Sequence, residues 1–196
     1  MREVELKSVV PDPEHLVDAL RAAGAVSILE GRLSDTRYDT GDRALLARDH
    51  VLRLRVFSGA AGSHASLDWK GATSLADGYK VREEISSAIG DADALARMLD
   101  GLGYVVIREV QRTISQFEFL GAVVRVERYP RMDALVEIEG DPVAIESAIA
   151  GSGLPRGGFT AERLSDFVTR FESRTAQRAA LSDRELAGDY RYAANA

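Results

Sequence analysis

The sequence predicts an α+β fold: an eight-stranded antiparallel β-barrel with helices packed outside it. Three observations support this prediction. Several segments alternate apolar and charged residues with a period of two, as strands with one apolar and one charged face do. Other segments carry apolar residues at helical spacing behind N-capping signals. The charged strand positions hold almost no Ser, Thr, Asn or Gln, which is unusual for a face in contact with water.

The alternation is clearest in six segments and weaker in two more. The clear ones are residues 3–7, 52–56, 67–70, 80–85, 124–127 and 136–139, and the weaker ones are 37–40 and 104–114. Gly-rich turns at 58–64 and 73–78 join neighbouring segments as hairpins. The count is therefore about eight strands, mostly antiparallel.

Four helices are expected outside the sheet. They run from Asp12-Pro13 to Gly24, from Asp91 to about Gly101, from Asp141-Pro142 onward, and over about residues 161–178. Ser182 and Glu185 fit a capping box, so the last residues can form one more short, loosely docked helix. We therefore expect one domain over residues 1–178 and a C-terminal tail over 179–196.

The amino-acid composition excludes several classes of function and partner. The 196 residues include 25 Lys and Arg against 31 Asp and Glu, a net charge of −6, which argues against a nucleic-acid partner. The absence of cysteine excludes disulfides and thiolate chemistry, and the three histidines do not form a zinc signature. No apolar run approaches the roughly 20 residues of a membrane span, and the N-terminus is charged. We expect a cytoplasmic monomer or homodimer without a membrane partner.

The charged faces allow two interpretations. An open amphipathic sheet would leave them in water, whereas a closed eight-stranded sheet would make them line an interior wide enough for one small ligand. The basic members are Lys7, Arg53, Arg55, Lys70, Lys80, Arg82, Arg108, Arg112 and Arg125. The acidic members are Glu3, Glu5, Asp39, Asp68, Glu84, Glu127, Glu137 and Glu139.

Inside a barrel, so many cations would require a polyanion, and arginine suits phosphate geometry. The carboxylate pairs Glu3/Glu5 and Glu137/Glu139 would converge if the first and last strands were adjacent. Carboxylates grouped in this way, together with phosphate oxygens, are suitable ligands for Mg²⁺ or Mn²⁺.

Several motifs, in order, resemble those of the CYTH superfamily, the triphosphate tunnel metalloenzymes. The residues 3–7 match its ExExK signature, and the later matches are Tyr38-Asp39-Thr40, Leu52-Arg53-Leu54-Arg55, Leu67-Asp68-Trp69-Lys70-Gly71, Val81-Arg82-Glu83-Glu84, Arg112 and Val136-Glu137-Ile138-Glu139. The resemblance spans about residues 2–170. It implies an eight-stranded antiparallel tunnel with helices outside, in agreement with the closed-sheet interpretation.

The resemblance also implies roles for individual residues. Glu3, Glu5, Glu137 and Glu139 would hold the metal, and Lys7, Arg53, Arg55, Lys70, Arg82 and Arg112 would bind the triphosphate. The shared strand face adds Lys80, Arg108 and Arg125 to the phosphate set and Glu127 to the metal set. Glu84 would orient the attacking water or a second metal ion, and Lys70 is expected to be catalytic together with Glu84.

One departure from the family pattern concerns the sixth strand segment, residues 104–114. Val110 stands where the family often has lysine, and Ser115 follows where a tyrosine is common; Arg108 shares the strand face and is a replacement for the missing cation. Trp69 is expected to face away from the lumen, and Tyr38 is expected to pack on the sheet and not to act as a catalytic acid. His50 and His64 are expected at the surface.

The expected function is hydrolysis of a small-molecule triphosphate, either inorganic tripolyphosphate or an organic triphosphate, with Mg²⁺ or Mn²⁺. Three alternatives remain open: a class IV type adenylate cyclase, a thiamine triphosphatase, and a triphosphate-binding module without catalysis.

Overall fold

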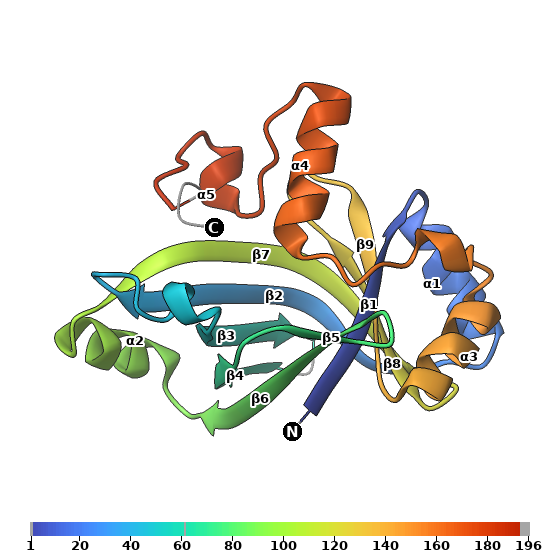
Figure 1. Cartoon of the computed structure of the whole chain (residues 1–196), viewed down its shortest axis with the longest axis horizontal. Helices are drawn as coiled ribbons and strands as arrows, with labels where there is room; N and C mark the ends of the chain where they lie inside the picture. Colours follow the sequence, from blue (N-terminus) through green and yellow to red (C-terminus); the bar gives the residue numbers. More distant parts are fainter. Residues whose placement is uncertain (1, 61, 193–196) are drawn as a thin grey trace.

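The protein is a closed β-barrel with helices around it (Figure 1). The structure, a computed structural model, describes residues 2–60 and 62–192. The strands are β1 (Arg2–Val10), β2 (Val26–Thr40), β3 (Val51–Gly59), β4 (Gly62–Lys70), β5 (Ser74–Ala76), β6 (Tyr79–Ile89), β7 (Tyr104–Phe119), β8 (Ala122–Arg128) and β9 (Ala134–Glu139). The helices are α1 (Pro13–Ala22), α2 (Ala92–Gly101), α3 (Pro142–Ser152), α4 (Leu164–Thr175) and α5 (Asp183–Leu186), with short 3₁₀ turns η1 (Leu46–Arg48) and η2 (Arg156–Gly158).

Eight strands close the barrel, and this confirms the predicted fold class. Their order is β1-β9-β8-β7-β2-β3-β4-β6, and β6 returns to β1 through the pairs from Arg2↔Glu83 to Glu5↔Lys80. The pairings between the strands are antiparallel. Strand β5, which was not expected, is a short addition to the edge of β6. Strand β2 is much longer than the expected residues 37–40 and pairs with β7 along most of its length.

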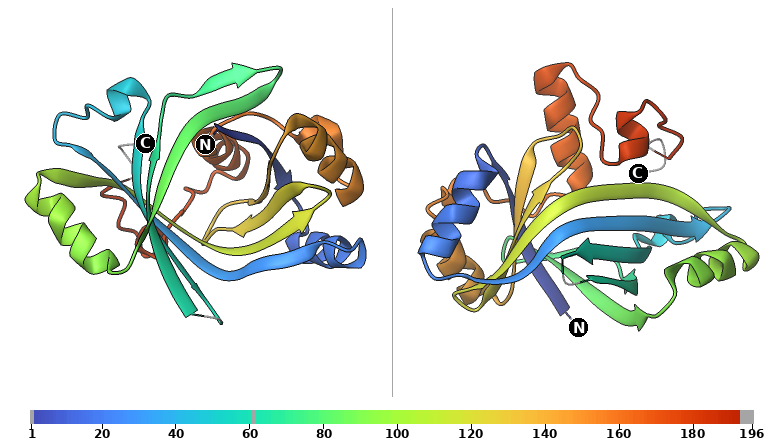
Figure 2. Two further views of the ribbon diagram at one scale, coloured as in Figure 1. Left: turned by 90° about the horizontal axis from the view of Figure 1, so that it is seen from below. Right: turned by 180° about the vertical axis from the view of Figure 1, so that it is seen from behind.

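The helices begin where the capping signals placed them. The carboxylates of Asp12, Asp91 and Asp141 accept backbone N–H groups at the starts of α1, α2 and α3. In Figure 2, α1 and α3 lie together at one end of the barrel and α2 lies at the other end. None of the described helices combines the length and apolar composition needed to span a membrane.

The main apolar core lies between the outer face of the barrel and the helices α1 and α3. Leu6, Val124 and Ile138 from the strands and Leu20 and Ile145 from the helices are almost completely buried there. A second cluster packs Tyr38 and Leu54 against Leu99 of α2, as expected for a Tyr38 that packs on the sheet. Because both apolar faces point outward to helices, the alternate, charged face of each strand points into the barrel.

A third cluster lies inside the barrel and limits its hollow part. Leu33 is the cross-strand partner of both Arg112 and Phe57, and cross-strand partners point to the same side of a sheet. Leu33, Phe57 and Ile114 are therefore internal and fill the barrel beyond the charged region. The polar interior ends at this apolar plug.

The C-terminal segment completes the barrel wall. Strand β8 pairs with β7 only from Thr113 to Phe119, which leaves the first part of β7 without a partner on that side. There the Gln111 N–H donates to the Leu181 carbonyl at 2.6 Å, and Ala180 and Arg131 exchange two backbone hydrogen bonds. Ala180 and Leu181 are buried. The short helix α5 has Ser182 as its N-cap, as the sequence suggested.

Candidate active site

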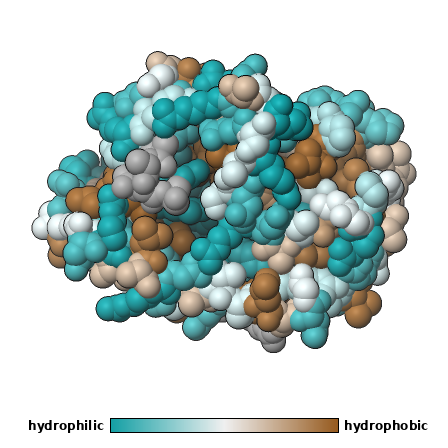
Figure 3. Space-filling model, turned by 45° about the horizontal axis from the view of Figure 1, so that its top comes forward, coloured by the Kyte–Doolittle hydropathy of each residue, from teal (hydrophilic) through white to brown (hydrophobic). Residues whose placement is uncertain are grey.

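The barrel encloses a cavity of about 690 Å³ lined mainly by charged side chains. Every residue that the sequence assigned to the site lines it: Glu3, Glu5, Lys7, Arg53, Arg55, Lys70, Lys80, Arg82, Glu84, Arg108, Arg112, Arg125, Glu127, Glu137 and Glu139. The structure brings these residues into one place, while their individual roles stay predictions. Figure 3 shows that the face carrying α4 and the C-terminal segment is hollowed near its centre and largely hydrophilic.

At one side of the cavity, Lys7 joins the carboxylates of strands β1 and β9. Its Nζ lies 2.6 Å from Glu5 and 2.6 Å from Glu137. Burial disfavours the charged form of Lys7, but Glu137 and Glu5 outweigh it and raise the pKa of the ammonium above its usual value. Glu137 also accepts from Arg125 at 2.8 Å, and Lys80 contacts Glu5.

A second lysine links the predicted metal and catalytic carboxylates. Lys70 Nζ lies 2.6 Å from Glu3 and 3.0 Å from Glu84. Glu84 is also 3.5 Å from Arg53. The two residues predicted to be catalytic, Lys70 and Glu84, are therefore in direct contact on the wall of the cavity.

Negative charge is not fully balanced near Glu139. Its cross-strand partner is Glu5, and among the described residues it has no ion pair. Burial, followed by the charges of Glu137 and Glu3, raises the pKa of Glu139 to about 7. Burial and the neighbouring Glu5 likewise raise the pKa of Glu3, although Lys70 opposes this. A bound cation would relieve this crowding of carboxylates.

The donor chemistry here fits a hard divalent cation, because Glu3, Glu5, Glu137 and Glu139 offer carboxylate oxygens from adjacent strands. In the described part of the chain, however, no three acidic or histidine side chains already converge as metal ligands. Glu5 and Glu137 share Lys7 instead. Binding a metal therefore requires these side chains to exchange ammonium partners for the ion.

Glu127, which was also predicted to hold the metal, has partners other than those of Glu3, Glu5, Glu137 and Glu139. One of its oxygens accepts from Arg112 Nε at 2.7 Å, and the other accepts from the hydroxyl of Tyr129. Burial and the Glu127 carboxylate raise the pKa of Tyr129 well above its ordinary value. Glu127 therefore holds Arg112 in this structure.

Asp35 organises the arginines, and sequence reasoning missed it. Its carboxylate accepts from Arg55 Nε at 2.8 Å and from Arg112 at 2.9 Å, with Arg53 3.5 Å away. Although burial opposes ionisation, Arg53 and Arg112 hold the pKa of Asp35 well below its usual value. The spacing of two between Asp35 and Arg37 could have placed Asp35 on the charged strand face. It was missed because the strand was expected to begin only at Arg37.

The acidic residues Asp39 and Asp68 have structural partners. Both oxygens of Asp39 accept backbone N–H groups, from Leu45 and Leu46, and so fix the η1 loop. Asp68 pairs with Arg53 at 2.6 Å. Neither lines the cavity, although both belong to the charged strand face.

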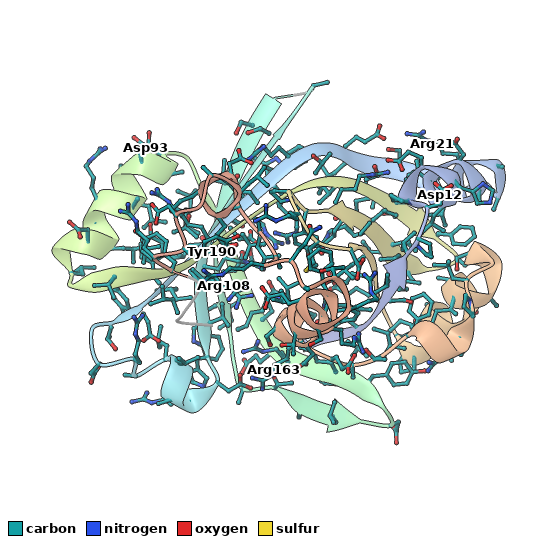
Figure 4. The ribbon with its side chains drawn as sticks, turned by 90° about the horizontal axis from the view of Figure 1, so that it is seen from above. Asp12, Arg21, Asp93, Arg108, Arg163 and Tyr190 are labelled. Carbon is teal, nitrogen blue, oxygen red and sulfur yellow. The ribbon has the colours of Figure 1, made fainter. Side chains whose placement is uncertain are left out.

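Arg37 is a second residue that the sequence analysis did not single out. It lines the cavity directly opposite Arg108 in the pairing of β2 with β7. Burial, and after it the charge of Arg108, lowers the pKa of Arg37 to about 9. Arg108 is buried. In Figure 4 it lies near the centre of the molecule, whereas Asp12, Arg21 and Asp93 lie at the periphery.

The mouth of the cavity is formed by loops and by the start of α4. Arg82 donates to the carbonyls of Gly71 and Asp49, at 2.7 and 2.6 Å, and so ties two loops together. The side chain of Asp49 pairs with Arg163, just before α4, at 3.0 Å.

His50 lines the cavity beside this loop and contacts the ring of Trp69 edge-on, with the centroids 5.1 Å apart. The expectation that His50 is an ordinary surface residue was therefore wrong, because the η1 loop folds over the barrel. Trp69 does not line the cavity, in agreement with its predicted outward direction.

The fold and the site define a class of protein: a closed antiparallel β-barrel whose interior is lined by carboxylates, arginines and lysines. Within that class, residues 1–139 match the model of the CYTH domain. The chain belongs to the CYTH family.

Solved structures agree with this assignment. The PH1819 protein from Pyrococcus horikoshii is similar with a TM-score of 0.71 and 22% identity, over 86% of this chain and 98% of that one. A candidate adenylate cyclase from Vibrio parahaemolyticus has a TM-score of 0.71 and 22% identity, over 85% and 97% of the two chains. A candidate adenylyl cyclase from Hippeastrum with a dominant triphosphatase activity has a TM-score of 0.62 and 18% identity, over 88% and 95%. At these identities the likeness shows the fold alone. No curated protein matches the sequence significantly.

Proposed function

We propose that this protein is a divalent-metal-dependent hydrolase of triphosphate substrates. The observation that carries the proposal is the single cavity in which the acidic ends of β1 and β9 face a set of arginines and lysines. CYTH proteins are generally triphosphatases or cyclases. Phosphoryl transfer depends mainly on positioning and charge neutralisation, which such a cavity supplies without a covalent nucleophile.

The cations would bind the phosphate chain. Lys7, Lys80 and Arg125 are held by carboxylates at one side of the cavity, and Arg53, Arg55 and Arg112 are held by Asp35 at the other. Pairing fixes the side chains before a ligand arrives. A phosphate group would take over hydrogen bonds from these carboxylates, so the protein side chains need little further ordering.

Mg²⁺ or Mn²⁺ would be held by Glu3, Glu5, Glu137 and Glu139, and when bound the ion supplies positive charge that polarises phosphoryl oxygens. Glu84 would accept the proton of the attacking water while the oxygen of that water bonds to phosphorus and the bridging P–O bond breaks. Lys70, in contact with Glu84 at 3.0 Å, would hold this carboxylate directed into the cavity.

A cyclase acting on ATP is a second candidate, because the cavity has apolar residues at its mouth. Leu46 and Ile85 line it and are about half exposed, and His50 lines it as well. A cavity of about 690 Å³ is also within the range that holds drug-sized organic ligands. These features favour a substrate with an organic group at one end of its triphosphate.

The test is to measure phosphate release and cyclic-nucleotide formation side by side on tripolyphosphate, ATP and thiamine triphosphate, with Mg²⁺ and with Mn²⁺. We expect metal-dependent phosphate release. Cyclic AMP as the main product from ATP would support the cyclase instead. Tight triphosphate binding without any product would leave a binding module.

A further inference from the structure

Arg37 and Arg108 differ from the other cavity cations because neither has a partner among the described residues. They are cross-strand partners on β2 and β7, and both line the cavity. Arg108 is 7% exposed, and the Nε of Arg37 is buried without a hydrogen-bond acceptor. The structure thus places two unpaired guanidinium groups side by side in the barrel interior.

A β-bulge on β7 helps to produce this arrangement. The register shifts between the pairs Arg37↔Arg108 and Tyr38↔Val106, so Ile107 is the extra residue. Ile107 and Arg108 both line the cavity, although they are consecutive. Bulges of this kind redirect side chains near functional sites.

The nearby acids do not compensate these charges. Asp35 is held by Arg55 and Arg112. Glu185, which lies close enough to favour the charged form of Arg108, accepts the Leu181 N–H at 2.6 Å and makes no ion pair with Arg108. Like charges directly opposite one another in a sheet destabilise it, and buried unpaired ions cost several kcal/mol in general. An anion bound between the two arginines would compensate both charges.

We propose that Arg37 and Arg108 form an oxyanion subsite that binds a phosphate group without a metal ion. Two guanidinium forks from adjacent strands can each donate two hydrogen bonds to a tetrahedral oxyanion. The subsite is separated from Arg112 by Val110, which is buried, uncharged and also lines the cavity. On the other side of β2 it adjoins Arg53, the cross-strand partner of Arg37 on β3. Unlike Arg53, neither Arg37 nor Arg108 has a carboxylate partner among the described residues.

The phosphate can be the end of a substrate's phosphate chain or a free phosphate ion. Binding of a substrate's phosphate chain rests on the proposed function. Binding of a free phosphate ion does not, since the subsite would bind it even if the protein hydrolysed no triphosphate. The C-terminal segment lies beside this part of β7, because the Gln111 N–H donates to the Leu181 carbonyl and Glu185 lies close enough to Arg108 to favour its charged form.

The test is calorimetric titration of the metal-free protein in EDTA with inorganic phosphate, pyrophosphate and tripolyphosphate. Arg37→Gln and Arg108→Gln are compared with Arg21→Gln, which removes an exposed arginine on α1 paired with Glu30. We expect Arg37→Gln and Arg108→Gln each to lose affinity about tenfold or more for at least one of these anions. Arg21→Gln should keep the affinity of the wild type. Loss for all three anions would indicate a site for free phosphate, and loss for tripolyphosphate alone would indicate the end of a chain.

Thermal unfolding without ligand separates a binding role from a structural one. Removing one of two repelling charges should leave the melting temperature of Arg37→Gln and Arg108→Gln at or above that of the wild type. Arg37→Lys should keep part of the affinity. Wild-type affinity in both Gln variants would overturn the subsite, even if the enzyme hydrolyses triphosphates; lost affinity in a protein without hydrolase activity would uphold it and reject only the proposed function.

Discussion

Lys7 and Glu137 are directly opposite in the pairing of β1 with β9, and the Lys7 Nζ lies 2.6 Å from the Glu137 carboxylate. The contact joins the N-terminal ExExK motif to the acidic motif 130 residues later, since 137 − 7 = 130. It also gives Glu137 a structural role, in addition to the metal-binding role that the sequence suggested. The two neighbouring glutamates of β9 therefore behave differently on substitution.

Glu137→Gln should lower both stability and activity. The substitution leaves Lys7 and Arg125 buried with one carboxylate fewer, and breaking a buried ion pair costs about 3 kcal/mol or more. Glu139→Gln removes a carboxylate without a cation partner and should leave the metal-free protein at least as stable. Urea unfolding of both variants in EDTA checks this; equal stability losses would contradict the difference in their surroundings.

Metal-dependent activity should fall in both Glu137→Gln and Glu139→Gln. Loss of a ligand should reduce metal-dependent phosphate release by roughly 100-fold, the size of effect seen when one group that stabilises developing charge is removed. The measurement is the Mn²⁺ dependence of phosphate release from tripolyphosphate. A Glu139→Gln variant with wild-type rate and wild-type Mn²⁺ dependence would remove Glu139 from the metal set.

The metal-free protein should lose stability as the pH rises from about 4 to 7. The pKa of Glu139 is about 7 in the folded chain, against about 4.3 in an unfolded one. In this window the folded state holds a proton that the unfolded state has released, so rising pH favours unfolding, by roughly 2 kcal/mol after allowance for partial exposure. Urea unfolding at several pH values in EDTA measures the slope. Glu139→Gln should flatten it, and an unchanged slope in that variant would assign the effect to another group.

Glu84→Gln should lower turnover with little change in the Michaelis constant. A carboxylate that accepts a proton in the transition state contributes about 10²- to 10⁴-fold to the rate. The matched control is Glu83→Gln, the exposed neighbour on the opposite face of β6. Steady-state phosphate release on the preferred triphosphate tests this pair. Similar rates for the two variants would show that Glu84 does not handle the proton.

Leu181→Ala should destabilise the protein by about 2 to 4 kcal/mol, because Leu181 is 1% exposed and its segment completes the wall beside β7. Leu186→Ala, at a residue 47% exposed, is the control and should cost much less. Chemical denaturation of both variants measures the difference. A loss below about 0.5 kcal/mol for Leu181→Ala would mean that the segment is only loosely attached.

The sequence by itself determined the fold class and most of the charged residues that line the cavity. Because side chains alternate along a strand, the period of two in residues such as Glu3, Glu5 and Lys7 places them on one face without knowledge of their partners. Capping aspartates likewise fixed where α1, α2 and α3 begin. These are local properties, so they can be read from a short stretch of chain.

Only the tertiary structure decided which charges meet and which do not. Asp35 lies in a stretch of β2 with weak alternation, and its partners Arg55 and Arg112 come from other strands. The isolation of Arg37 and Arg108 depends on register and on a bulge, and the docking of Leu181 depends on the gap where β8 ends. Pairing between distant segments is set by strand register and by the packing of the whole barrel, and the local pattern around each residue carries neither.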